Sequence, residues 1–167
     1  TDADLGPVLS VIFVDGYFMT TDGTSLVVTE LADPEDVDPL KYGSAEQDPD
    51  SVRGVAKVRN EPIAVGRFTL ETFTNVGGTG FPFQRIDGAL VTKGSIGSSS
   101  YCVHALQTGG DVLAFVGSGK KESPSVYFAA NASVIRIATQ EIDTILQGYA
   151  EGVLAEQCVV ESRVDRG

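Results

Sequence analysis

The sequence contains three tight-turn signals, each lying between two short runs of apolar and β-branched residues. They are Asp15-Gly16, Asn60-Glu61 and Gly109-Gly110, and they lie 45 and 49 residues apart. Repeats of this length, with three or four strands per unit, are typical of β-propeller blades. One small twisted sheet cannot bury both of its apolar faces, so such sheets stack. The spacing predicts an all-β chain forming a partial β-propeller of about three antiparallel blades plus a C-terminal helix, with a β-sandwich as the alternative.

Each repeat supplies strands rich in Val, Ile, Thr, Tyr and Phe, the residues that favour half-buried sheets. The expected strands are 11–14, 17–20 and 25–29 in the first group, 55–59, 63–65 and 67–73 in the second, and 101–106, 111–116, 125–129 and 133–137 in the third. Residues 60–62 are expected to turn the chain in the second group, and residues 81–86 to be extended around Pro82, which cannot donate to a sheet ladder.

Two long loops and one helix complete the predicted organisation. Residues 31–53 combine carboxylates with three prolines and are expected to form a surface loop. That loop and the loop at 74–94 are the predicted contact surfaces, because long loops usually have a functional reason to persist. A helix is expected at 139–148, capped by Thr139, with Ile142, Ile145 and Leu146 on one apolar face, and a helical turn at 150–155.

The charge balance argues against nucleic-acid binding. The chain carries 23 Asp and Glu against 12 Lys and Arg, a net charge of −11, whereas nucleic-acid affinity depends on Lys and Arg that neutralise phosphates. The densest basic spot, Lys120-Lys121, is interpreted as a solvated turn. Cys102 and Cys158 are interpreted as small buried apolar residues. The sequence has no signal peptide and no apolar run of transmembrane length, which favours folding in the cytosol.

No residue pattern predicts catalysis, a cofactor or a metal site. Cys102 and the only histidine, His104, share one face of a strand, yet a nucleophilic pair also needs an orienting group and an oxyanion site. The acidic loop lacks the spacing of a calcium loop. Residues 20–24 resemble a sugar-hydrolase turn motif only loosely. The Gly-rich stretches at 77–80 and 117–121 lack the spacing of a phosphate-binding loop. The chain is therefore expected not to be an enzyme.

Several segments, taken in order, resemble one family. They are Gly16-Tyr17-Phe18-Met19-Thr20-Thr21-Asp22-Gly23-Thr24, 31–35, Asp38-Pro39, 43–46, 60–65, 68–73, Phe81-Pro82-Phe83-Gln84, 92–97, 124–127 and 142–146. Together they resemble the packaged-DNA stabilisation proteins of short-tailed bacteriophages, which are tail accessory or head-completion factors. The resemblance covers residues 10 to about 160, and the family's chains are longer. Two further features indicate a longer protein. The chain begins with Thr1 and not with Met, and the apolar run at 158–160 is interpreted as a strand that has no later strand to pair with.

The resemblance implies a structural role in the virion. Its implied partners are copies of the chain itself in a ring, the portal and adaptor proteins and the tail needle. The implied role is to retain packaged DNA and to link the portal and adaptor ring to the tail tip, without sequence-specific nucleic-acid binding and without a membrane. Assembly is expected in the host cytoplasm. Residues 1–167 are expected to form a single domain, the central part of a longer chain. The alternative is a propeller module that binds or cleaves carbohydrate.

Overall fold

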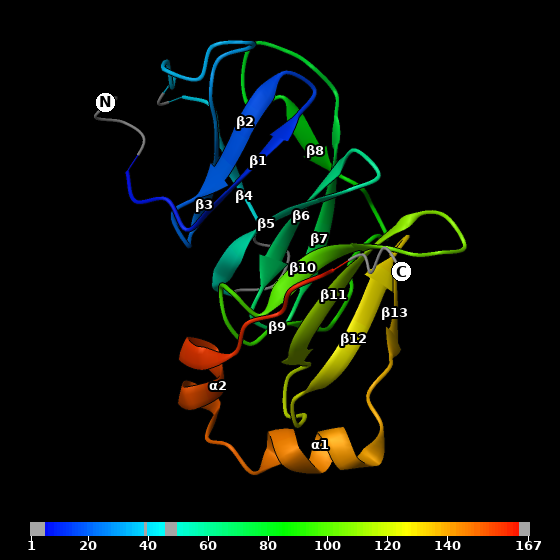
Figure 1. Ribbon diagram of the computed structural model, residues 1–167. Helices are drawn as coiled ribbons and strands as arrows, with labels where there is room; N and C mark the ends of the chain where they lie inside the picture. The colour runs from blue at the N-terminus through cyan, green and yellow to red at the C-terminus, as the bar shows by residue number, and fades with distance from the viewer. Residues whose placement is uncertain (1–5, 39, 46–49, 164–167) are drawn as a thin grey trace.

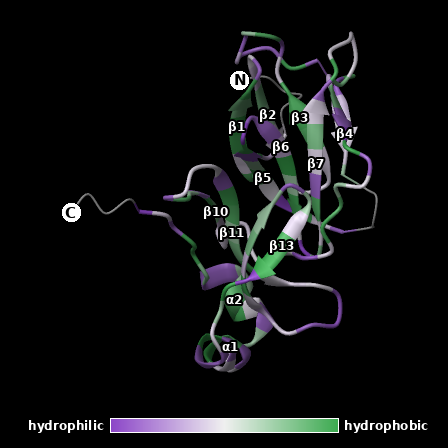
Figure 2. Ribbon diagram, turned by 90° about the vertical axis from the view of Figure 1, so that its right-hand side faces the viewer, coloured by the Kyte–Doolittle hydropathy of each residue, from purple (hydrophilic) through white to green (hydrophobic). Residues whose placement is uncertain are grey.

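The fold consists of three antiparallel sheets stacked one against the next, with two helices at one end (Figure 1). It is described here from a computed structural model, which describes residues 6–38, 40–45 and 50–163. Hydrophobic residues are concentrated in the strands, and hydrophilic residues are frequent in the connecting loops (Figure 2). The prediction of an all-β chain with about three blades and a C-terminal helix is confirmed, since a β-sandwich would have two sheets.

The strands follow one another along the chain within each sheet, so every blade is a meander. Blade 1 contains β1 (Ser10–Val14), β2 (Tyr17–Thr21), β3 (Ser25–Val28) and β4 (Tyr42–Ser44). Blade 2 contains β5 (Val52–Val58), β6 (Glu61–Gly66), β7 (Leu70–Asn75) and β8 (Phe83–Arg85). Blade 3 contains β10 (Tyr101–Ala105), β11 (Asp111–Ser118), β12 (Ser125–Ala130) and β13 (Ser133–Arg136), and the short β9 (Gly94–Ser95) pairs with β11.

The turn of the second blade lies one residue earlier than predicted. Arg59 and Asn60 form it, and both have the left-handed backbone that a two-residue hairpin turn requires, with φ of 51° and 67°. Pro62 therefore lies in β6, opposite Lys57. The strand predicted from residue 67 begins at Leu70, because the Gly66 N–H donates to the Thr69 carbonyl and closes a turn between β6 and β7.

The prediction that residues 31–53 form one long loop is wrong in its middle and at its C-terminal end. β4 lies inside it and pairs with the outer edge of β3, and β5 begins at Val52. The Phe81 ring lies against Gly43 so closely that a Cβ there would be 2.3 Å from a ring carbon. The pairing arises from a free strand edge and a tertiary contact, and neither leaves a local pattern in the sequence. Pro39, Glu46, Asp48 and Pro49 lie outside the described residues.

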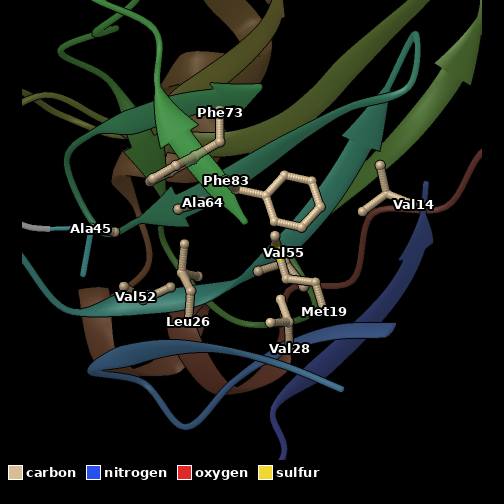
Figure 3. Close-up of a cluster of buried hydrophobic side chains, with 10 residues drawn as sticks. All are labelled: Val14, Met19, Leu26, Val28, Ala45, Val52, Val55, Ala64, Phe73 and Phe83. Carbon is tan, nitrogen blue, oxygen red and sulfur yellow. The ribbon is translucent and has the colours of Figure 1, made fainter. Parts of the chain in front are cut away.

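Two apolar clusters hold the blades together, one on each face of blade 2. The first is contributed by blade 1, blade 2 and the chain between them: Val14, Met19, Leu26, Val28, Ala45, Val52, Val55, Ala64, Phe73 and Phe83 (Figure 3). The second joins blades 2 and 3: Ala56, Val58, Ile63, Val65, Leu70, Val91, Leu113, Phe115, Tyr127 and Ala129. Neighbouring residues of β5 thus face opposite clusters, as the period of two in a strand requires. Blade 2 is the buried layer of the stack.

The first strands of the three blades meet at Gly54 and Val55 of β5. The Ser10 hydroxyl of β1 accepts a hydrogen bond from the Val55 N–H at 2.7 Å, and the Tyr101 hydroxyl of β10 donates to the Val55 carbonyl at 3.3 Å. Burial raises the pKa of Tyr101, which keeps its hydroxyl protonated as a donor. A Cβ at Gly54 would lie 1.9 Å from the Tyr101 hydroxyl oxygen and 2.8 Å from that of Ser10. Only glycine allows both strands to approach this closely.

Two helices, α1 (Gln140–Gln147) and α2 (Glu151–Gln157), lie at the end of blade 3 that is farthest from blade 1 (Figure 1). Leu154 joins Ile96 and Val116 in a third apolar cluster, against which Leu146 and Val160 are partly buried. The buried Arg67 of the β6–β7 turn donates to Glu151 at 2.7 Å and to the Ser118 hydroxyl at 3.2 Å. This contact fastens α2 to blades 2 and 3.

Three details of this region differ from the prediction. Thr139 precedes α1 but makes no side-chain capping bond, and its hydroxyl instead bonds the Glu141 carboxylate, which with the Glu141 N–H lowers the pKa of Glu141. The turn at 150–155 is a full helix. Residues 158–160 form no strand; the segment runs beside β10, with one backbone bond from Val160 to Ser99 at 3.0 Å (Figure 1, red).

Substitution of Gly54 by Ala should lower the free energy of unfolding by about 1–3 kcal/mol, because an added methyl group must displace the Tyr101 or Ser10 hydroxyl and break its hydrogen bond to Val55. Gly80→Ala is the matched control, since a Cβ there meets no atom within 4 Å. Urea unfolding followed by circular dichroism measures both variants. Equal stability of the two variants would show that the three-strand junction does not constrain the fold.

Candidate interaction surfaces

The turns that open each blade lie side by side along one edge of the stack. The Asn60 side-chain amide donates to one carboxylate oxygen of Asp15 at 2.6 Å, and that of Asn75 donates to the other at 3.2 Å. Arg59 donates to the side-chain carbonyl of Asn131 in the β12–β13 turn at 2.8 Å, and its guanidinium lies beside Gly110, where a Cβ would be 2.9 Å from it. The three predicted turns therefore lie at the same edge of the stack, where polar side chains connect blade to blade.

A groove of about 280 Å³ lies between blades 2 and 3 beside this polar edge. Its floor is apolar and includes the buried Val58, Ile63 and Ala89. Its walls include Arg59 together with the exposed carboxylates Glu61 and Asp87. Part of the loop predicted at 74–94 as a contact surface, residues 86–89, contributes to this wall. The groove is open and carries charges of both signs.

The outer face of blade 1 is an open apolar surface. Along β1, Val14 faces the first cluster and is fully buried, whereas Val11 and Phe13 are 59% and 51% exposed. Leu9 continues this surface at 47% exposure, and the Phe13 ring contacts that of Phe18 at 5.0 Å between centroids. Contiguous exposed apolar residues on a sheet face are characteristic of interaction sites.

The carboxylates of the predicted acidic loop are engaged in local structure. Asp33 and Asp38 accept backbone bonds from Glu35 and Leu40, at 3.0 and 2.9 Å, and Glu30 pairs with Lys41, which raises the pKa of Lys41. Over the part of the chain that the structure describes, no group of three or more His, Cys, Asp and Glu side chains could hold a metal ion. Glu35 and Asp36 are exposed, so this loop presents negative charge.

Cys102 and His104 lie on one face of β10, as predicted, but His104 is engaged elsewhere. Its Nδ1 lies 2.8 Å from the Ser162 hydroxyl, and its ring stacks on Phe128. The prediction that Cys102 and Cys158 are buried is wrong in degree: both are free thiols that are partly exposed. Burial nevertheless raises the pKa of both thiols, which opposes thiolate formation.

The other motifs considered in the sequence lie in turns. Residues 20–24 contain the end of β2 and the β2–β3 turn, where one carboxylate oxygen of Asp22 accepts the N–H groups of Thr24 and Ser25, each at 2.7 Å. Lys120 and Lys121 lie in an exposed turn between β11 and β12. Among the described residues no helix is both long and apolar enough to cross a membrane.

Alkylation by iodoacetamide should be slower at Cys102 and Cys158 than at free cysteine at pH 7, since burial raises both thiol pKa values and the thiolate is the nucleophile. Both rates should increase with pH beyond the ordinary thiol range. Mass spectrometry of tryptic peptides measures each site. Rapid labelling of Cys102 at pH 6 that is lost in His104→Ala would instead reveal a histidine-activated thiol.

Comparison with known proteins gives two findings. A family model described as "Bacteriophage P22 Gp10, beta-propeller" matches residues 1–167. The chain is also 28% identical over 173 residues to a protein of Salmonella phage P22 named "Tail hub protein gp10". That alignment covers 99% of this chain and 35% of the phage P22 protein, so the chain spans about a third of its relative's length.

Proposed function

Because the chain belongs to the family of bacteriophage P22 Gp10 β-propeller proteins, we propose that it is a structural component of a phage tail. In this role it forms part of the connection between the portal and adaptor ring and the tail tip. The name of its P22 relative, a tail hub protein, supports this assignment. The proposal places the chain in the virion, after assembly in the host cytoplasm, and gives it a mechanical task in place of a catalytic one.

The observation that carries the proposal is a stack of three blades in which the outer sheet face of blade 1 leaves large apolar side chains uncovered. Blade 2 is buried on both faces, and the helices cover part of blade 3, where Ile135 stays 59% exposed. Blade 1 leaves a row of three large apolar side chains in solvent, Leu9, Val11 and Phe13. Burial of apolar surface is the main driving force of stable association. We propose that this face is covered in the assembled tail.

A ring of copies requires a heterologous contact, in which two different surfaces of one molecule meet. The stack has different surfaces at its two ends: the apolar sheet face of blade 1, and on blade 3 an open apolar pocket lined by Val112, Phe128 and Ile135. Such a ring, together with portal, adaptor and needle proteins, is the assembly that the proposal implies. Residues 1–167 act in it as a single domain of a longer chain.

Retention of packaged DNA in this proposal is physical obstruction, not adhesion. Affinity for duplex DNA requires several Lys and Arg that neutralise phosphates, whereas this chain has a net charge of −11. A passage bordered by carboxylates repels the DNA backbone, so the DNA slides freely once the tail opens. Retention then depends on physical obstruction by the assembled tail.

Gold-labelled antibodies against this chain should bind to the tail of particles of the phage that encodes it, as seen by negative-stain electron microscopy. Prior incubation of the antibodies with the purified chain should abolish the labelling, which is the control for specificity. Labelling confined to the capsid shell, or particles from which the chain is absent by immunoblot, would contradict the proposed function.

A further inference from the structure

Helix α1 has its apolar residues outside and its acid inside. Ile142 and Ile145 are 41% and 60% exposed, and Tyr149, which follows in the same row, is 56% exposed. The buried residue of the helix is Asp143, at 7% exposure. A surface helix normally turns its apolar stripe to the core and its charged residues to water. The sequence pattern predicted an apolar face of Ile142, Ile145 and Leu146, and only Leu146 packs against a cluster.

Specific bonds to blade 3 hold the helix in this orientation. One carboxylate oxygen of Asp143 accepts the Ser125 hydroxyl of β12 at 2.5 Å, and the other accepts Arg136 of β13 at 3.0 Å. Rotation of α1 to bury Ile145 would break both bonds and expose Leu146. Removing one partner of a buried charged pair is strongly unfavourable. The outward apolar stripe is therefore enforced by the fold, and it does not contribute to folding of the chain.

The surface around the stripe is acidic. Residues 138–157 contain Glu141, Asp143, Glu151 and Glu156 and no Lys, Arg or His. Asp143 and Glu151 are neutralised by Arg136 and Arg67. Glu141 and Glu156 remain exposed, and no salt bridge joins either of them to a cation within the described ranges. Two copies that met through this surface would bring like charges together, whereas a partner with flanking cations would be complementary.

We propose that the α1 stripe, defined as Ile142, Ile145 and Tyr149, is a docking site for an amphipathic helix of another protein, whose apolar residues are flanked by Lys or Arg. Ile142 and Ile145 are neighbours at i and i+3 on the helix, and exposed Tyr149 follows just after the helix ends at Gln147, so an apposed helix would meet one apolar strip. The flanking cations of the partner would meet Glu141, which lies one helical turn before Ile145. This inference rests on the proposed function only in naming the partner as a second virion protein.

The test uses the purified chain and two fluorescein-labelled designed helical peptides with the same Leu stripe, one flanked by Lys and the other by Glu. Fluorescence anisotropy should show binding of the Lys-flanked peptide and at least about tenfold weaker binding of the Glu-flanked peptide. Ile145→Lys should weaken binding of the Lys-flanked peptide about tenfold or more. Because Ile145 is exposed, the variant should unfold at the same temperature as the original chain.

Val11→Lys is the matched control. Val11 is as exposed as Ile145 but lies in blade 1, and the substitution adds the same charge. It should leave peptide binding within about twofold, which separates a local site from general attraction to an acidic protein.

Equal weakening by the two substitutions, or absence of binding, would overturn the proposal. A concentration-dependent dimer in light scattering that Ile145→Lys abolishes would overturn it in favour of a second copy. Ile145→Ser replaces the Lys variant if the latter unfolds. The assay involves no virion, so its failure leaves the tail assignment unaffected.

Discussion

The approach of three strands at Gly54 and Val55 is the constraint on which the arrangement of the blades depends. The backbone of Val55 binds Ser10 on one side and Tyr101 on the other, so the N–H and carbonyl of one residue fix the first strands of blades 1 and 3. The absence of a Cβ at Gly54 allows this approach. A register irregularity between Val52 and Gly54 then places Val52 and Val55 in the same cluster. The apolar clusters on the two faces of blade 2 fill the space that this junction defines.

Much of the blade structure could be predicted because it is encoded locally. Asp15 and Gly16 have the positive φ values that their hairpin turn needs, 50° and 87°, and few residue pairs accept them. The uninterrupted apolar run from Val112 to Val116 lies within β11, and all five of its residues are buried. In such segments the backbone preference of the residues and the burial of their side chains favour the same structure, so the sequence pattern alone predicts the element.

The unpredicted parts depend on contacts between residues far apart in the chain. β4 has no alternating pattern and exists because the edge of β3 accepts it and Phe81 packs on Gly43. β9 is two residues that complete the edge of β11. The orientation of α1 contradicts its own periodicity, because Ser125 and Arg136 bind the Asp143 carboxylate on the inner side of the helix. Periodicity can report that a helix has an apolar face, but not whether that face meets the chain's own core.

The contrast between the two ends of the stack follows from how each sheet face is covered. On blade 3, Ile96, Val116 and Leu154 form a cluster with the helices over part of the outer face, and the buried Arg67 ties α2 to two blades. Ile135 on that face stays 59% exposed. On blade 1, Val11 and Phe13 remain open to solvent. Capping of one end and an open apolar face at the other give the stack a direction. A directional unit favours head-to-tail contacts, which close into rings when the rotation per step divides a full turn. The same polarity leaves the acidic outer surface of α1 free for a partner of different chemistry.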